Sequence, residues 1–134
     1  MLPAGSRLHT SDEFATVVRL GRRSAAPRLV VHLLIEEPGA GSTRAPRVGF
    51  VVSGKVGNAV VRHRVTRRLR ALVRSQLAVL PVGADVVVRA LPAAAAATSA
   101  ELGGDLRTAL AGAMRKARGT AATGSRARVV GAGR

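Results

Sequence analysis

The chain has 134 residues, 47% of them hydrophobic, and a formal net charge of +15. This length is typical of one domain, and the lack of cysteine excludes disulfides and thiolate metal sites. No secretion signal and no apolar stretch of about 18 residues is present, which excludes a membrane-spanning protein and leads us to expect a cytoplasmic one.

The first predicted element is a helix over residues 11–20. Thr10 and Glu13 have the spacing of a capping box, in which each side chain accepts a hydrogen bond from the other residue's backbone. Gly21 stands where such a helix would end. Apolar residues recur inside the segment at helical spacing, at Phe14, Val17 and Val18.

Three runs of apolar and β-branched residues predict strands. They span residues 28–36, 46–53 and 84–91. A Gly- and Pro-containing loop separates the first two runs, so we expect these two strands to pair in antiparallel fashion across it.

Two further helices are predicted, over residues 58–79 and 99–117. Asn58 can cap the first, and Thr98 with Glu101 has the spacing of a second capping box. The remaining segment, 118–134, is basic and has no apolar periodicity, so we predict a disordered tail after a single domain of residues 1–117. The order of elements is α-β-β-α-β-α. This order predicts an α+β fold, a small two-layer sandwich of helices against a sheet.

The helix predicted over 58–79 has one apolar and one basic face. Residues 57–74 hold six arginines and a histidine, and no acidic residue occurs between Glu37 and Asp85. Steps of 100° per residue separate an apolar sector of Val61, Val65, Leu69 and Leu72, with Gln76 beside it, from a basic sector of His63, Arg67, Arg70 and Arg74.

Like charges at this spacing destabilise a helix by roughly 0.2–0.5 kcal/mol per pair. A bound polyanion would remove that repulsion, and the planar guanidinium group of arginine suits phosphate. Backbone N–H groups after the turn around Lys55 can also bind a phosphate oxygen. We therefore predict RNA binding by Lys55, Asn58, Arg62, His63, Arg64, Arg67, Arg68, Arg70 and Arg74.

The string "RVGFVVSGKVGNAVVRHRVTRRLRALVR", residues 47–74, resembles the signature region of the bacterial ribonuclease P protein component. The order and spacing of the other predicted elements agree with that family over residues 2–117. The family usually has Arg-Asn-Arg where this chain has Arg62-His63-Arg64. It usually has a basic residue at the positions of Gly54 and Thr66.

The resemblance implies that the protein is a subunit of ribonuclease P, which removes the 5′ leader from precursor tRNA by Mg²⁺-dependent hydrolysis. The RNA subunit would be the catalyst, and the protein would bind that RNA and aid substrate and metal affinity. The implied partners are the catalytic RNA subunit and precursor tRNA, with no protein partner and no membrane. Mg²⁺ is expected in the RNA-containing holoenzyme, and no cofactor is expected on the protein alone.

The family fold is an α/β sandwich with a left-handed βαβ crossover, although about 98% of such crossovers are right-handed. In the family the leader lies in a cleft between the first helix and the sheet. The positions carried over to that cleft are Phe14, His32 and Phe50. A ring can stack on a base of any identity, although both phenylalanines could instead be core residues.

Chemistry by the protein itself is not expected. Its seven acidic residues show no metal-ligand spacing and its three histidines are scattered, so we predict no catalytic residue and no metal ligand. Two alternatives remain open. A ribosomal protein or assembly factor fits the composition equally well, and an anionic-membrane binder is disfavoured because the basic helix has no aromatic residue.

Overall fold

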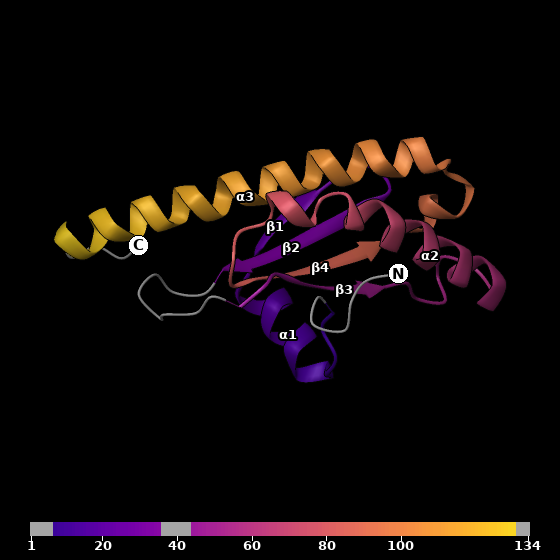
Figure 1. The fold of residues 1–134 in the computed structure, drawn as a ribbon, viewed down its shortest axis with the longest axis horizontal. Helices are drawn as coiled ribbons and strands as arrows, with labels where there is room; N and C mark the ends of the chain where they lie inside the picture. The colour runs from indigo at the N-terminus through magenta and orange to yellow at the C-terminus, as the bar shows by residue number, and fades with distance from the viewer. Residues whose placement is uncertain (1–6, 36–43, 131–134) are drawn as a thin grey trace.

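The computed structural model describes residues 7–35 and 44–130, with side chains up to residue 118. The α+β class predicted from the sequence is confirmed (Figure 1). The elements in chain order are α1 (Ser11–Leu20), β1 (Arg22–Ala25), β2 (Leu29–Ile35), β3 (Arg47–Val51), α2 (Ala59–Arg74), the 3₁₀ turn η2 (Leu77–Val79), β4 (Ala84–Ala90), the 3₁₀ turn η3 (Pro92–Ala96) and α3 (Ser99–Val130).

The four strands form one mixed sheet in the order β1-β2-β4-β3. The predicted pairing of the first two apolar strands is wrong, because β4 lies between β2 and β3. β4 is antiparallel to β2 and parallel to β3. The parallel pair needs a crossover connection, which α2 provides. The handedness of that crossover stays a prediction.

Strand β1 was not predicted from the sequence. Its four residues, RRSA, include two arginines and no apolar alternation. It forms one edge of the sheet, where charged residues are common because they discourage pairing with another chain. Ser24 is its single buried residue.

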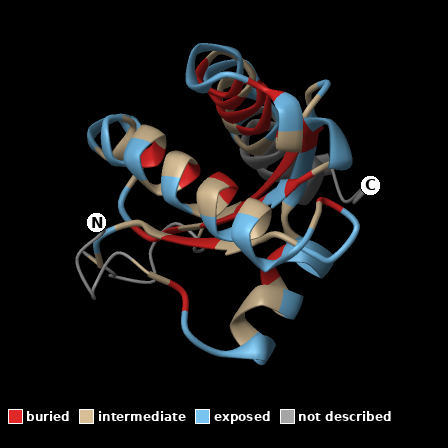
Figure 2. Cartoon of the chain, turned by 90° about the vertical axis from the view of Figure 1, so that its right-hand side faces the viewer, coloured by how far each residue is buried: buried red, intermediate tan, exposed pale blue. Residues whose placement is uncertain are grey.

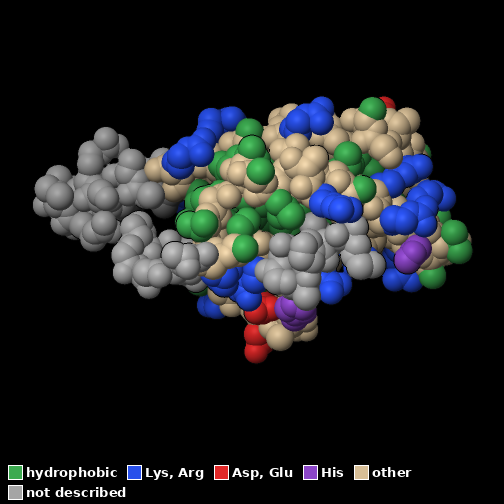
Figure 3. Space-filling model, viewed as in Figure 1, with side chains coloured by type: hydrophobic (Ala, Val, Ile, Leu, Met, Phe, Trp, Pro, Cys, Tyr) green, Lys and Arg blue, Asp and Glu red, His purple; other side chains and the backbone are tan. Residues whose placement is uncertain are grey.

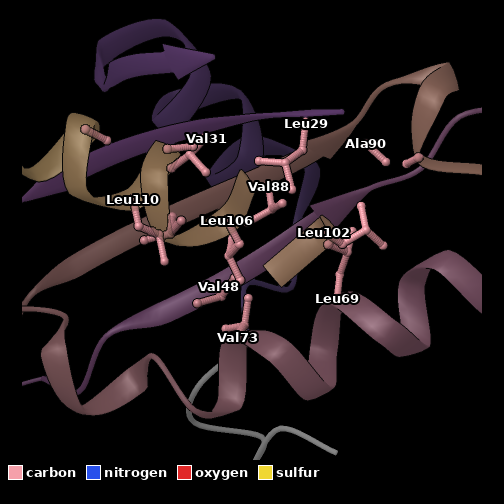
Figure 4. Packing of buried hydrophobic residues seen from close by; sticks show 14 of the residues in the cluster. Leu29, Val31, Val48, Leu69, Val73, Val88, Ala90, Leu102, Leu106 and Leu110 are labelled. Atoms are coloured by element: carbon pink, nitrogen blue, oxygen red, sulfur yellow. The ribbon is translucent and has the colours of Figure 1, made fainter. Parts of the chain in front are cut away.

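Helices cover both faces of the sheet (Figures 1 and 2). On one face α2 and α3 bury the main core, which Figure 4 shows between Leu69 of α2, Leu106 of α3 and Val88 of β4. On the other face α1 packs a smaller cluster around Val17 and Val87. The short helix α1 therefore adds a partial third layer to the predicted two-layer sandwich.

Two helices end elsewhere than predicted. α2 stops at Arg74 rather than 79, where the Ser75 hydroxyl donates to the Leu72 carbonyl and the chain turns into η2. α3 continues to Val130, whereas the sequence predicted an end at 117 and disorder over 118–134. Alanine and arginine, which favour helix, occur repeatedly in this stretch. Residues 131–134 lie outside the described residues.

Candidate nucleic-acid interface

Helix α2 is positioned by its cap and its apolar face. The Asn58 side chain accepts a hydrogen bond from the Val61 N–H at 3.0 Å, which confirms the predicted cap. Val65, Leu69 and Val73 are fully buried against the sheet and α3. This burial turns the opposite side of α2 outward.

The predicted RNA-binding residues divide into two groups by exposure. The exposed residues are Lys55, Asn58, His63, Arg67 and Arg74, and the half-buried ones are Arg62, Arg64, Arg68 and Arg70. Lys and Arg side chains gather over the α2 end of the molecule in Figure 3. We call the outward sector of α2 that contains His63, Arg67, Arg70 and Arg74 the α2 basic face.

Two of the half-buried arginines also hold the fold together. Arg68 donates to the Ala97 carbonyl at 2.9 Å, and Arg64 donates to the Ala95 carbonyl at 3.4 Å. Both carbonyls belong to the alanine-rich stretch between β4 and α3. This role could not be predicted from local sequence patterns, because the acceptors are backbone atoms about 30 residues away.

No described carboxylate neutralises the α2 basic face. In the part of the chain that the structure describes, ion pairs are formed only by Arg28, Arg44 and Arg47. These arginines engage Glu13, Asp85, Glu101 and Asp105. Within the described residues, the positive charge of α2 is therefore left available to an anionic ligand.

The turn before α2 leaves Lys55 exposed. A Cβ atom on Gly54 would meet no atom within 4 Å, so this glycine borders open space. A Cβ atom on Gly57 would lie 2.8 Å from a methyl carbon of Val61. Gly57 is thus explained by the close approach of α2, whereas Lys55 is free to contact a ligand.

The three predicted leader-cleft residues do not lie together. Phe14 belongs to the cluster under α1, and a Cβ atom on Gly49 would lie 2.3 Å from the tip of its ring. Phe50 packs instead against the main core on the opposite face, because neighbouring strand residues point to opposite sides. Phe50 is therefore placed as a core residue, the alternative that the sequence left open.

His32 lies on the same face as Phe14 and is only 6% exposed. Its Nδ1 atom is buried and has no hydrogen-bond partner. Burial lowers the pKa of His32, and the positive charges of Arg89 and Arg23 lower it further. Burial and the two nearby arginines thus favour the neutral imidazole. Neither arginine was predicted to lie beside His32, because their positions depend on the strand register.

An ion-pair network fixes α1 to the sheet. Arg47 of β3 donates to Glu13 of α1 at 2.9 Å and, through two nitrogens, to Asp85 of β4 at 2.9 Å. Arg44 donates to the same Asp85 at 2.9 Å. Glu13 also completes the predicted capping box with Thr10. This network sets the position of Phe14 above the sheet.

Backbone N–H groups of His9 and Thr10, followed by Arg47, lower the pKa of Glu13 to about 2. Because the folded pKa is below the unfolded one, Glu13 stabilises the fold above about pH 4.5, and this stabilisation is lost as the pH falls toward 2. Glu13 is half-buried, so screening reduces the effect to about 1–2 kcal/mol.

We therefore expect Glu13→Gln to unfold with a flatter pH dependence than the unsubstituted protein. Urea unfolding at pH 7 and at about pH 3 measures the free energy of unfolding of both proteins. The unsubstituted protein should have the larger free energy of unfolding at pH 7, and its advantage over the variant should be about 1 kcal/mol smaller at about pH 3. An equal difference at both values would contradict the role given to Glu13.

The described residues contain no group of three or more His, Asp or Glu side chains that could hold a metal ion. Four of the acidic side chains are engaged by arginines instead, as described above. No described helix is long and apolar enough to cross a bilayer.

The fold and the α2 basic face define a small, basic α+β protein whose helix α2 presents positive charges that no described carboxylate pairs with. The model of the family Ribonuclease P matches residues 2–114. The ribonuclease P protein component of Streptomyces avermitilis is 54% identical over 114 residues, covering 82% of this chain and 93% of its own. That of Mycobacterium sp. (strain KMS) is 52% identical over 112 residues, covering 82% and 91%.

Solved structures agree with this fold. The ribonuclease P protein of Staphylococcus aureus superposes with a TM-score of 0.66 at 24% identity, covering 78% of this chain and 92% of that one. The Thermotoga maritima protein gives a TM-score of 0.62 at 24% identity, covering 76% and 92%. The chain belongs to the ribonuclease P protein family, and hence to the subunits of an endoribonuclease complex that processes tRNA.

Proposed function

We propose that this protein binds the catalytic RNA subunit of ribonuclease P through the α2 basic face and the 5′ leader of precursor tRNA through the sheet face beside α1. The complex removes the leader by Mg²⁺-dependent hydrolysis in the bacterial cytoplasm. The observation that carries the proposal is that no described carboxylate compensates the α2 basic face.

Binding through α2 follows from charge and geometry. Arg67 and Arg74 are exposed, and each guanidinium group can donate two hydrogen bonds to one phosphate. Each phosphate neutralised also releases condensed counterions, so binding depends steeply on salt. Exposed His63 stands where the family usually has asparagine and can also donate a hydrogen bond to RNA.

Leader binding beside α1 is supported by a half-buried ring and two exposed cations. Phe14 offers a surface for a base, and Arg23 and Arg89 can meet the leader phosphates. His32 lies between the two arginines but is mostly covered, so only the edge of its ring is available. These contacts do not read base edges, which suits a protein that meets many leader sequences.

The described part of the protein does not fit a Mg²⁺ site, since its acidic side chains do not cluster. We propose that the RNA holds the metal. The protein raises metal affinity indirectly, because its arginines neutralise phosphates and hold the RNA in its active arrangement.

The direct test is reconstitution of precursor-tRNA cleavage with the cognate RNA subunit at low Mg²⁺. Addition of this protein should increase the cleavage rate and lower the Mg²⁺ concentration needed. An RNA subunit whose cleavage is unchanged by the protein would contradict the proposed function.

Leader contact is tested by Phe14→Leu, which removes the aromatic ring but keeps apolar volume under α1. Loss of stacking should weaken binding of precursor tRNA to the reconstituted complex about 5–150-fold, since a base stack contributes about 1–3 kcal/mol. Binding of mature tRNA should change less than twofold. The matched control is Phe50→Leu, because Phe50 lies on the other face, and equal losses in both variants would contradict the assignment.

A further inference from the structure

A second group of uncompensated positive charges lies where β1 meets the later turns of α3. It comprises Arg22 of β1 and Arg115, Lys116 and Arg118 of α3. All four side chains are exposed. We call this group the β1–α3 basic surface. Figure 3 shows Lys and Arg side chains along α3 as far as its described end.

Close packing brings these residues together from distant parts of the chain. A Cβ atom on Gly112 of α3 would lie 2.5 Å from the Ser24 hydroxyl oxygen, so α3 lies directly against β1. One turn later, the Lys116 ammonium group donates to the Arg23 carbonyl at 2.6 Å. Side chains two residues apart in a strand point to the same face. Arg22 therefore lies on the same side of β1 as the buried Ser24, which faces α3.

No described carboxylate balances these charges. Glu101 and Asp105 are on α3, but they pair with Arg28 at the other end of the β1–β2 hairpin. The ion pairs of Asp85 and Glu13 are with Arg44 and Arg47. Among the described residues, therefore, no carboxylate offsets the four cations, and an anionic ligand can do so.

This surface is separate from the α2 basic face. The first turns of α3 contact α2, where a Cβ atom on Gly103 would lie 3.2 Å from Leu72. Lys116 is 13 residues farther along α3, which corresponds to about 20 Å along the helix axis. A ligand bound to α2 therefore does not neutralise the β1–α3 basic surface.

Resting on the proposed function, we propose that the β1–α3 basic surface is a second RNA-binding surface, which holds a phosphate backbone distinct from the one on α2. Its three arginines match phosphate geometry. The chain's two aromatic residues, Phe14 and Phe50, are both elsewhere, so the surface has no ring to stack on a base. Binding there is therefore electrostatic and independent of sequence. The bound phosphates belong either to the RNA subunit or to precursor tRNA.

The test variant is Arg22→Gln/Arg115→Gln/Arg118→Gln, which retains Lys116 because it contacts the β1 backbone. Replacing the same arginines with lysine is the charge-conserving control. Two affinities are measured as a function of salt: protein for the RNA subunit, and reconstituted complex for precursor tRNA. Thermal unfolding verifies that the variants remain folded.

The glutamine variant should lose at least about tenfold in one of the two affinities, and its slope of log affinity against log salt should fall by about 2 to 3. Loss in the first assay identifies the RNA subunit as ligand, and loss in the second identifies precursor tRNA. The lysine variant should keep the slope. The proposal would be overturned if the glutamine variant kept both affinities and both salt slopes. It would also be overturned if the variant lost binding only to anionic lipid vesicles and to neither RNA.

Failure of the proposed function gives a different result. In that case the unsubstituted protein would not stimulate cleavage, whatever the effect of the glutamine and lysine variants of the β1–α3 basic surface. The same variants would then be titrated with an unrelated RNA duplex. Undiminished binding of that duplex by the glutamine variant would overturn the second surface independently.

Discussion

Replacing Arg67, Arg70 and Arg74 together with glutamine is expected to weaken binding of the RNA subunit about 100-fold near physiological salt. The reason is that three neutralised phosphates contribute about 2 to 3 units to the slope of log affinity against log salt. Filter binding or fluorescence titration over about 0.05–0.5 M salt measures both quantities. Because none of the three makes an ion pair among the described residues, the fold should remain intact.

The matched control replaces the same three residues with lysine, which keeps the charge but loses the paired hydrogen bonds. Its salt slope should stay close to that of the unsubstituted protein, while its affinity falls less than in the glutamine variant. Arg68→Gln, in contrast to the triple variant, should affect the fold. It removes the hydrogen bond to the Ala97 carbonyl and should lower stability by about 1 kcal/mol. An unchanged slope in the glutamine triple variant would rule out phosphate contact by α2.

Gly49→Ala is expected to displace α1 and to lower stability by about 1–3 kcal/mol. The new methyl carbon would lie 2.3 Å from the tip of the Phe14 ring and 3.1 Å from Leu8, so the ring or the helix must move. Relative to the unsubstituted protein, the variant should lose more affinity for precursor tRNA than for mature tRNA, because the moved ring belongs to the proposed leader surface. Urea unfolding and tRNA titration measure the two effects.

Two further variants isolate the contact between the methyl group and the ring. Gly54→Ala adds the same methyl group where no atom lies within 4 Å, and should change stability by less than about 0.5 kcal/mol. Phe14→Ala removes the ring, so Gly49→Ala should cost at least about 1 kcal/mol less in that background. Additive effects of the two substitutions would show that the predicted clash is absent.

Local sequence signals identified most of the secondary structure. The capping boxes at Thr10 and Thr98 and the cap at Asn58 form as predicted, since each depends on side chains within three residues. Apolar periodicity likewise placed the buried side of α2. These signals are strong because the interacting groups are close along the chain.

The sheet could not be assembled from the same signals. Neighbouring strands in the sequence were expected to pair, but β4 takes the place between β2 and β3. Each β4 residue from Val86 to Val88 is buried on one face or the other, which makes this strand suited to the interior. Nothing local distinguishes such a strand from one at an edge.

The candidate site was predicted as a set of residue types rather than as a surface. Arg67 and Arg74 are exposed as expected, whereas Arg64 and Arg68 donate to backbone carbonyls in and just after η3. The separation of Phe50 from Phe14 depends on which face of β3 each position meets. The second basic surface depends on packing of α3 on β1, which no local pattern reports.

The position of β4 also governs how the nascent chain can fold. Strands β2 and β3 have no shared edge until residues 84–90 are inserted between them. A fragment ending before Ala84 would leave β3 without its parallel partner and β2 paired with β1 alone, so α2 would lack part of the sheet on which it packs. About two-thirds of the protein must therefore be synthesised before the four-stranded sheet that orients the cationic helix can form.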